Sequence, residues 1–468
     1  MAWAARGVHK STRLLGGQKP VRPIAVTSEL HRDASPDARW PRDDPYPSRA
    51  ALHGEACSPS ALRDPLPVEA VAAMTAVRDR TLALVDGISH DAMERQTDPR
   101  MSPLVWDLAH IAAFEDLWLV HRHGGRDLLR PDLAALYDAF ETPRETRGEQ
   151  ELLNLPEALR YLADVRERSL EATARRGVDE QRHELVIRHE LQHTETMLQA
   201  MALAGLRPGL VRPPRGVGGP LRLATVDGGT AAIGAGDDGF AYDNERPRHR
   251  RDLVPFRIAT RPLSVGDWRA FADDGGYEDR RWWDDKGWAW RQAPDRAPHG
   301  SPPTMSNGVP ALAPNDSAGP DPVSGTNRHP GFNPGTGTGG DAPAGPPVDA
   351  HDDDPACHLS WFEARALCAH LGLRLPTEAE WEHAAASGLL QDVGAVWEWT
   401  ATTFDGYPGF RADPYPEYSQ VFFNSGLRVL RGGSFAAHPR VATTTFRNWD
   451  LPRRCQIFAG VRPAGDVA

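Results

Sequence analysis

Apolar residues recur at spacings of three and four in four segments of the first half of the chain. The predicted helices span residues 67–88, 102–124, 154–177 and 179–205. This spacing places the apolar side chains on one face of each helix. Ser102 is the expected N-cap of the second helix, and Gly124 and Gly177 are expected to close the second and third. Four such helices predict an antiparallel four-helix bundle.

The second half of the chain has short strand-like runs separated by turns. The predicted strands and helices span residues 230–235, 254–260 and 429–436, and residues 264–276 and 360–372, respectively. Short β-branched and aromatic runs bounded by glycine and proline are typical of strands joined by irregular loops. The expected fold class is therefore α+β, with a helical bundle followed by a domain of little regular structure.

Changes in composition predict where the domains begin and end. Residues 1–64 mix Pro, Arg, Asp and Ser without periodicity and are expected to form a disordered extension. The bundle is expected over residues 65–206, a linker rich in Pro and Gly over 207–222, and the α+β domain over 223–468. Residues 292–353 are rich in Gly, Pro, Asn and Asp, so we expect a surface insertion there.

Charge and cysteine content exclude several classes of protein. The 468 residues carry a formal net charge of −11, which disfavours non-specific binding to nucleic acid or to an anionic membrane. The sequence has no apolar span of membrane length and no signal-peptide pattern. Its four cysteines are scattered without a C-x-x-C pair, so reduced thiols are expected. We therefore expect a cytoplasmic protein, with a monomer as the default.

The segment HELQH at residues 189–193 matches the zinc-protease pattern H-E-x-x-H. His189 and His193 lie one helical turn apart, and Glu190 occupies the position of the general base in that pattern. A protease needs a third ligand downstream. The metzincin positions are Thr196 and Gln199, however, and residues 206–226 contain no acidic residue. The protease hypothesis therefore lacks its downstream ligand.

An upstream histidine offers a different third ligand. His110 lies in the middle of the second predicted helix among apolar residues, and a bundle could bring it against His189 and His193. Three imidazoles would hold a metal and leave positions open for substrate or oxygen. Zinc, iron and copper all accept histidine, so hydrolysis and oxygen chemistry both remain open. A buried core histidine satisfied by a hydrogen bond is the alternative for each residue.

Motifs spread over both halves carry a family resemblance. The second half contains, in order, GGTAAIGAG, NERPRHRRDLVPFRIATRPLSVGDWRAFADDGGY, RLPTEAEWEHAA, VWEWT and RVLRGGSF. Together they resemble the formylglycine-generating-enzyme (sulfatase-modifying factor) domain, which has a C-type-lectin-like fold. WDLAHI and HELQHTE resemble a DinB-like bundle. FRNWDLPRRCQIFAGVR is similar to the C-terminal signature of the sulfoxide synthases of ergothioneine biosynthesis. The resemblance covers residues 66–291 and 354–463.

The resemblance implies a non-haem Fe(II) enzyme. Members of that family use O2 to join a thiol sulfur to imidazole C2 of hercynine (N-α-trimethylhistidine) and oxidise the sulfur to a sulfoxide. The matching iron ligands are His110, His189 and His193. A tyrosine donates a proton in the family. Tyr407 is the implied catalytic donor here, with Tyr415 and Tyr418 as alternatives.

The resemblance also implies substrate contacts. Arg144 and Arg147 match paired arginines that hold the carboxylates of the thiol substrate, for which planar guanidinium groups are suited. Asp450 and Arg454 match positions that bind glutamyl amino and carboxylate groups, which favours γ-glutamylcysteine over free cysteine. The implied hercynine contacts are Gln192, Asn448 and Trp449.

Other functions remain as alternatives to this hypothesis. Free cysteine could replace γ-glutamylcysteine, or the chain could be a related thiol oxygenase. From a different class, it could be a metal-stabilised ligand-binding module without turnover. The chain departs from the family pattern at Cys455, where a second arginine is expected, and at the insertion over residues 292–353. The paired catalytic cysteines of formylglycine-generating enzymes have no counterpart here.

Overall fold

The structure is a computed structural model. It describes residues 67–206, 216–292 and 350–467. Contacts divide the chain into Met1–Asp64 and Pro65–Ala468, and every described residue belongs to the second unit. The extension predicted over residues 1–64 lies outside the described residues, as do most of the predicted linker and most of the predicted insertion.

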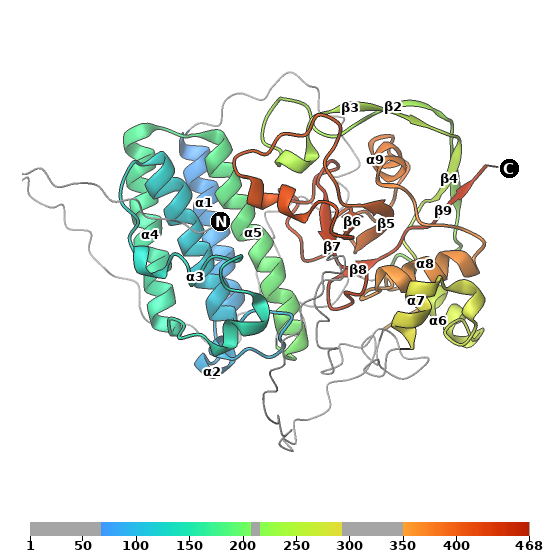
Figure 1. Cartoon of the computed structure of the whole chain (residues 1–468), viewed down its shortest axis with the longest axis horizontal. Coiled ribbons are helices and arrows are strands. Elements are labelled where there is room, and N and C mark those ends of the chain that lie inside the picture. The colour runs from blue at the N-terminus through green and yellow to red at the C-terminus, as the bar shows by residue number, and fades with distance from the viewer. Residues whose placement is uncertain (1–66, 207–215, 293–349, 468) are drawn as a thin grey trace, which may run out of the picture. The chain divides into compact units, whose positions relative to one another are not determined.

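The first described part is the predicted helical bundle. Its main helices are α1 (Pro67–Val85), α3 (Leu104–Glu115), α4 (Leu155–Arg176) and α5 (Glu180–Leu203). Shorter helices are α2 (His90–Glu94), η2 (Asp116–His123), η3 (Pro131–Leu133) and η4 (Arg144–Glu149), of which η2 is a π-helix that continues α3. Helix α3 packs against α4 and α5, and α1 packs against α5 (Figure 1). The four amphipathic segments therefore form the expected helices.

The helix ends follow local chemistry, with one exception. Asn154 and Glu157 form a capping box at the start of α4, and Gly177 ends that helix at φ +81°, a conformation that glycine adopts without strain. The predicted N-cap Ser102 is wrong. Helix α3 begins after Pro103, and the Ser102 hydroxyl instead accepts a hydrogen bond of 2.7 Å from Arg147 Nη1. A bond from a charged donor distant in the sequence replaces the local cap.

The second described part contains three small sheets. Their strand orders are β1-β4-β9, β2-β3 and β7-β6-β5-β8, and only the β5–β8 pairing is parallel among the described strands. The strands are β1 (Leu223–Val226), β2 (Gly229–Ile233), β3 (His249–Leu253), β4 (Phe256–Ala259), β5 (Trp397–Thr403), β6 (Arg428–Arg431), β7 (Asn448–Asp450), β8 (Ala459–Gly460) and β9 (Ala464–Asp466). The predicted strand-like runs overlap β2, β4 and β6.

Short helices surround these sheets. The α-helices are α6 (Val265–Asp273), α7 (Asp285–Arg291), α8 (Trp361–His370) and α9 (Glu378–Ala386). The 3₁₀ turns are η5 (Asp243–Glu245), η6 (Arg280–Trp282), η7 (Pro416–Tyr418) and η8 (Gln420–Phe422). Capping boxes led by Ser264, Ser360 and Thr377 begin α6, α8 and α9. The α+β class with sparse regular structure is confirmed.

Helix α5 joins the bundle to the second part. The buried Glu195 accepts hydrogen bonds of 2.7 Å from Trp397 Nε1 and from Ser434 Oγ. Nearby, Arg440 forms an ion pair with Glu184 of α5. A single hydrophobic cluster contains residues of α5 together with residues of β5 and of the loops around it. Because both parts share this core, residues from each can contribute to one site.

Two further expectations can be compared with the structure. Within the described ranges, no helix is both long and apolar enough to cross a membrane. The described cysteines, Cys357, Cys368 and Cys455, form no disulfide with one another.

Candidate metal and substrate site

Three histidines converge inside the bundle. His110 comes from α3, and His189 and His193 come from successive turns of α5. One ring nitrogen from each lies within 4.8 Å of the other two, and this histidine trio is a group that could hold a metal ion. His110 Nε2 and His189 Nε2 are 3.1 Å apart. The structure thus brings together the three residues that the sequence predicted as ligands.

Hydrogen bonds orient two of the three rings. His110 Nδ1 lies 2.7 Å from the carbonyl oxygen of Tyr137, and His193 Nδ1 lies 2.8 Å from Asp107 Oδ1. Because a carbonyl or a carboxylate accepts, each Nδ1 donates the hydrogen bond, and Nε2 is the nitrogen that faces the other rings of the trio. Such outer partners are typical of metal-bound histidines.

Aromatic rings hold the same side chains in place. Trp106 stacks on His110 with ring centroids 4.6 Å apart and an interplanar angle of 13°. Phe114 stacks on His189 with centroids 3.7 Å apart and an angle of 8°. Both aromatic residues are on α3. Their stacking restricts rotation of the imidazoles, so the trio is positioned before any ligand binds.

The electrostatic environment keeps two of the imidazoles neutral. Burial, followed by the neighbouring charge of His193, lowers the pKa of His110 well below its ordinary value. Burial, followed by the repulsion that its protonated ring would meet from protonated His193 and His110, lowers the pKa of His189 in the same way. Metal ions bind the unprotonated ring, so this environment favours coordination over protonation.

The spacing of the nitrogens fits a single metal ion. Two imidazole nitrogens bound to one ion at about 2.1 Å, at an angle between roughly 90° and 109°, are separated by about 3.0–3.4 Å. The 3.1 Å between His110 Nε2 and His189 Nε2 falls in this range. The donor set is nitrogen alone. It suits a divalent transition metal and does not distinguish iron from zinc.

Glu190 does not face this site. Its carboxylate accepts hydrogen bonds from Arg78, Arg166 and the hydroxyl of Thr81, and its side chain is fully buried. A general base must reach the proton that it removes, and both oxygens of Glu190 are already occupied. The structure therefore gives no support to the protease hypothesis, in which Glu190 would activate water.

Comparisons with known proteins agree with this architecture. The DinB superfamily profile matches residues 73–202, and the profile of the sulfatase-modifying factor enzyme 1-like domain matches residues 221–392 and 386–467. The chain is 38% identical to a hercynine oxygenase of Mycolicibacterium thermoresistibile, over 83% of this chain and 93% of that protein. It is 38% identical to a hercynine oxygenase of Mycobacterium tuberculosis, over 83% and 97% respectively.

The chain belongs to the hercynine oxygenase family. Similarity over most of both chains confirms the resemblance that the motifs indicated, and membership makes the protein an enzyme. A formylglycine-generating enzyme of Thermomonospora curvata is 34% identical over only 36% of this chain. That relative therefore shares only part of this chain.

The two predicted arginines differ in this hercynine oxygenase family member. Arg147 is buried, and its guanidinium donates to the carbonyl of Thr142 and the hydroxyl of Ser102 and lies 3.3 Å from the ring centroid of Trp106. Its planar group thus supports the ring that stacks on His110. Burial, followed by the charge of Arg144, lowers the pKa of Arg147 to about 9. The predicted contact of Arg147 with a carboxylate would have to compete with these bonds.

Arg144 is better placed for an anion. It is half-buried on η4, and burial followed by the charge of Arg454 lowers its pKa. Asp450 and Asp107 act in the opposite direction. Arg454 Nε lies 3.5 Å from Asp450 Oδ1, and Arg454 Nη1 is buried without a hydrogen-bond partner among the described residues. The guanidinium groups of Arg144 and Arg454 could bind a carboxylate of a ligand, and the neighbouring carboxylate of Asp450 could bind its amino group.

The predicted hercynine contacts lie on two elements. Gln192 is on α5 beside the trio, and its Oε1 accepts a 2.9 Å hydrogen bond from the Tyr242 hydroxyl. Asn448 and Trp449 are on β7, and Trp449 stacks on Phe404 with centroids 4.0 Å apart. The Tyr418 ring stacks on Tyr242 and lies 6.1 Å from Trp449. Aromatic rings therefore connect the two predicted groups.

The candidate tyrosines have different surroundings. Tyr407 lies in a hydrophobic cluster of the second part, with its hydroxyl 3.4 Å from Glu378 and its ring under Arg447. Tyr415 is half-buried and packs on Trp118, with centroids 5.2 Å apart, and Trp118 packs on Phe114 beside His189. Tyr407 therefore belongs to a buried network with Glu378 and Arg447, whereas a chain of aromatic rings connects Tyr415 to His189.

A buried carboxylate anchors the loop that carries these tyrosines. Asp243 accepts a hydrogen bond from the Ser419 hydroxyl and is 4% exposed. Burial raises its pKa from 3.8 to about 6, although the Ser419 bond opposes the shift. Because the pKa of Asp243 is higher in the folded state than in the unfolded state, its protonated carboxyl stabilises the fold. This contribution is fully present at a pH below the unfolded-state pKa and disappears as pH rises through about 6.

We expect Asp243→Asn to change the pH dependence of folding. The neutral amide avoids burying a charge, so relative to wild type the variant should gain stability when pH rises through about 6. Thermal unfolding of both proteins on either side of that pH measures the difference. A difference independent of pH would contradict the assigned origin of the shift.

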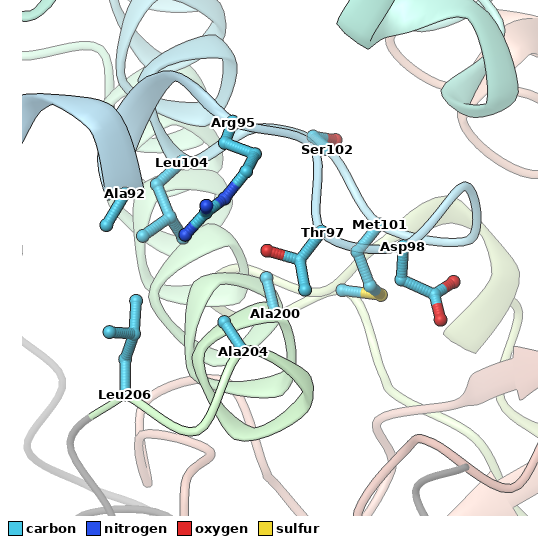
Figure 2. Close-up of a pocket in the computed structure, with 10 residues that line it drawn as sticks. All are labelled: Ala92, Arg95, Thr97, Asp98, Met101, Ser102, Leu104, Ala200, Ala204 and Leu206. Carbon is cyan, nitrogen blue, oxygen red and sulfur yellow. The ribbon is translucent and has the colours of Figure 1, made fainter. Parts of the chain in front are cut away.

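A small cavity lies at another place in the bundle. Figure 2 shows it between the start of α3 and the end of α5, lined by side chains that include Asp98, Met101, Ser102 and Ala200. Its volume of about 10 Å³ suits one water molecule. None of the histidine trio lines it, so it is separate from the candidate site.

Three partners of the site were not predicted from the sequence. They are Asp107, Tyr137 and Tyr242, which bond His193, His110 and Gln192. Asp107 had a local signal, since it lies one turn before His110 on the same helix. Tyr137 acts through its backbone carbonyl, and Tyr242 is 50 residues from its partner, so neither had a sequence signal.

Proposed function

We propose that this enzyme is an Fe(II)- and O2-dependent sulfoxide synthase of ergothioneine biosynthesis. It would join the sulfur of γ-glutamylcysteine to imidazole C2 of hercynine and oxidise that sulfur to the sulfoxide. The observation that carries the proposal is the histidine trio, whose ring nitrogens converge within 4.8 Å in a member of the hercynine oxygenase family. We further propose a cytoplasmic monomer acting on small molecules, without nucleic acid or membrane.

His110, His189 and His193 would hold the iron. A bound Fe(II) supplies the capacity to activate O2 and to bind a thiolate and an imidazole at positions that the protein leaves open. The chain orients the ligands through Asp107 and the Tyr137 carbonyl. Trp106 covers His110 and Phe114 covers His189, and each excludes water from one side of that ring.

The two substrates would use different sets of side chains around the trio. Arg144, Arg454 and Asp450 provide the charges for the glutamyl carboxylate and amino groups of γ-glutamylcysteine. Gln192, with its hydroxyl partner Tyr242, would contact the hercynine imidazole. The hercynine trimethylammonium group favours an aromatic face, for which Trp449 is available, with Asn448 preceding it on β7.

Replacing Arg144 tests the thiol side. Arg144→Ala should raise KM for γ-glutamylcysteine by about tenfold to a hundredfold, the range for losing a hydrogen bond to a charged group. The effect on free cysteine, which lacks the glutamyl group, should be smaller. Steady-state kinetics with both thiols measures this. Arg130→Ala is the control, because Arg130 pairs with Asp132 in solvent. Equal effects of the two variants would contradict the role of Arg144.

Tyr415 is the proposed proton donor. Burial raises the pKa of Tyr415 far above its ordinary value, so its hydroxyl stays protonated. Tyr418 is the second candidate, because its ring stacks on Tyr242, whose hydroxyl bonds Gln192 beside the trio. A proton delivered to reduced oxygen favours carbon–sulfur bond formation over simple oxidation of the thiol.

Tyr415→Phe should therefore change the products more than it changes binding. We expect the ratio of sulfoxide conjugate to oxidised thiol to fall by about a hundredfold, the lower end of the effect of a proton-transfer group. Mass spectrometry of both products gives the ratio. Tyr418→Phe is measured beside it, and Tyr407→Phe is the control. A fall only in Tyr407→Phe would restore the sequence-based choice.

The proposed function has a direct test. The protein is loaded with Fe(II) without oxygen, hercynine and γ-glutamylcysteine are added, O2 is admitted, and the products are analysed by mass spectrometry. The expected product is the sulfoxide conjugate. Parallel reactions with cysteine identify the thiol donor. No conjugate from either thiol would refute the proposal, and tight ligand binding without turnover would favour the binding-module alternative.

A further inference from the structure

Four buried charged side chains form a closed cluster beside the histidine trio. Each main helix of the bundle contributes one member: Arg78 from α1, Glu115 from α3, Arg166 from α4 and Glu190 from α5. The two glutamates are 0% exposed, and the side chains of Arg78 and Arg166 are 8% and 11% exposed. We call these residues the arginine–glutamate quartet.

Hydrogen bonds satisfy every nitrogen and oxygen of the quartet. Arg78 donates to Glu190 at 2.8 Å and to Glu115 at 2.9 Å. Arg166 donates to Glu115 at 2.7 Å and to Glu190 at 3.0 Å. The remaining guanidinium nitrogens donate to the carbonyls of Leu162 and Met74, and Thr81 donates to Glu190 at 2.8 Å. The formal charges cancel.

Such a cluster contributes more to specificity than to stability. Removing two ion pairs from water costs nearly as much free energy as their attraction returns, so apolar residues could stabilise the bundle equally well. A fully bonded charged network, however, tolerates only one arrangement of its helices. Burial, which opposes ionisation, is overcome by Arg166 and Arg78, and the pKa of Glu115 falls below its ordinary value. Glu115 therefore stays ionised between the two guanidinium groups.

The quartet acts on the helices that carry the trio. Glu190 directly follows His189 on α5, and Glu115 lies five residues after His110 on α3. Both glutamates bind the same two guanidinium groups. A slip of one helical turn moves a side chain by about 5.4 Å along the axis. Such a slip would separate His110 Nε2 from His189 Nε2, which now lie 3.1 Å apart.

We propose that the arginine–glutamate quartet is a positioning device that holds α3 and α5 in the register required for metal binding. Glu190 thus acts on the metal only through the position of His189. The inference rests on the proposed function, because it assumes that the trio binds a metal. It gives the glutamate of HELQH a role without a proton-transfer step.

The test uses Co(II) as a spectroscopic probe of the full-length chain. Wild type should bind Co(II) with a visible spectrum typical of nitrogen ligands, and His110→Ala should not. If wild type does not bind at the trio, the proposed function fails. If it binds, Glu190→Gln should weaken Co(II) binding by about tenfold to a hundredfold, as for outer partners of metal ligands, and should alter the spectrum.

Glu398→Gln is the matched control. Glu398 is also fully buried and accepts two hydrogen bonds of 2.7 Å from Arg462, but it lies on β5 outside the bundle. Both variants should lower the unfolding temperature, and only Glu190→Gln should change Co(II) affinity. Equal losses of affinity would indicate general loosening and overturn the proposal. So would unchanged affinity and spectrum in Glu190→Gln.

A milder variant decides the matter if Glu190→Gln does not fold. Arg78→Lys keeps the charge but loses the planar fork that binds both glutamates. It should weaken Co(II) binding in the same direction by about threefold to tenfold, a fraction of the full effect. Affinity equal to wild type in folded Arg78→Lys would overturn the proposal.

Discussion

Replacing His110 with alanine is expected to abolish iron binding and to reduce sulfoxide formation by at least about a thousandfold, a loss of about 4 kcal/mol of transition-state stabilisation. The two remaining histidines lie on one helix and cannot enclose an ion from two sides. His110 is buried, so the substitution also leaves a cavity and lowers stability. Iron content after gel filtration and product formation by mass spectrometry measure the two effects.

His183→Ala is the matched control for His110→Ala. His183 is also a buried histidine of the bundle, and it bonds the Thr173 hydroxyl and the carbonyl of Asp179. Its loss should lower the unfolding temperature without changing the content of the proposed iron. Full iron retention in His110→Ala would show that the third ligand has been assigned wrongly.

Asp107→Ala is expected to weaken metal binding by about a hundredfold, at the upper end for an outer partner of a metal ligand. Asp107 is 0% exposed, and its Oδ1 accepts a hydrogen bond from His193 Nδ1, with 2.8 Å between the two atoms. Without it, the half-buried His193 ring loses both its hydrogen bond and its orientation. Asp107→Asn keeps an acceptor oxygen and should weaken binding by only about tenfold. Co(II) titration of each folded variant measures the affinity.

Asp116→Asn controls for removal of a buried charge. Asp116 follows α3 directly, is 1% exposed and accepts a 2.7 Å hydrogen bond from the backbone of Leu129. It has no bond to the trio, so metal affinity should not change. If Asp107→Ala and Asp116→Asn have the same affinity, Asp107 does not orient His193.

Much of the fold follows from local patterns in the sequence. The four helices of the bundle were predictable because their apolar periodicity extends over several turns, and Gly177 supplies a left-handed end that other residues rarely adopt. The failure of Ser102 as a cap shows where local reasoning stops. Its hydroxyl bonds Arg147, which is 45 residues away.

The candidate site was predictable only in part. The i, i+4 spacing on one helix indicated His189 and His193, and the apolar surroundings of His110 indicated the third member. The predicted roles of Arg147 in substrate binding and of Tyr407 in proton donation did not take their tertiary neighbours into account. Arg147 forms bonds within the bundle, and Tyr407 lies in a separate network with Glu378 and Arg447. No spacing along the chain encodes either outcome.

The sequence alone therefore determines the helices, the fold class, the family and the three histidines, because periodicity, caps and ordered motifs are local properties of the chain. Only the tertiary structure decides which tyrosine aromatic rings connect to the trio, which arginines bond within the bundle, and which side chains Glu190 contacts. Those answers depend on side chains that meet across long stretches of sequence, such as Arg78 and Glu190, 112 residues apart. In HELQH the two histidines turn toward the proposed metal, while the glutamate turns toward the arginines.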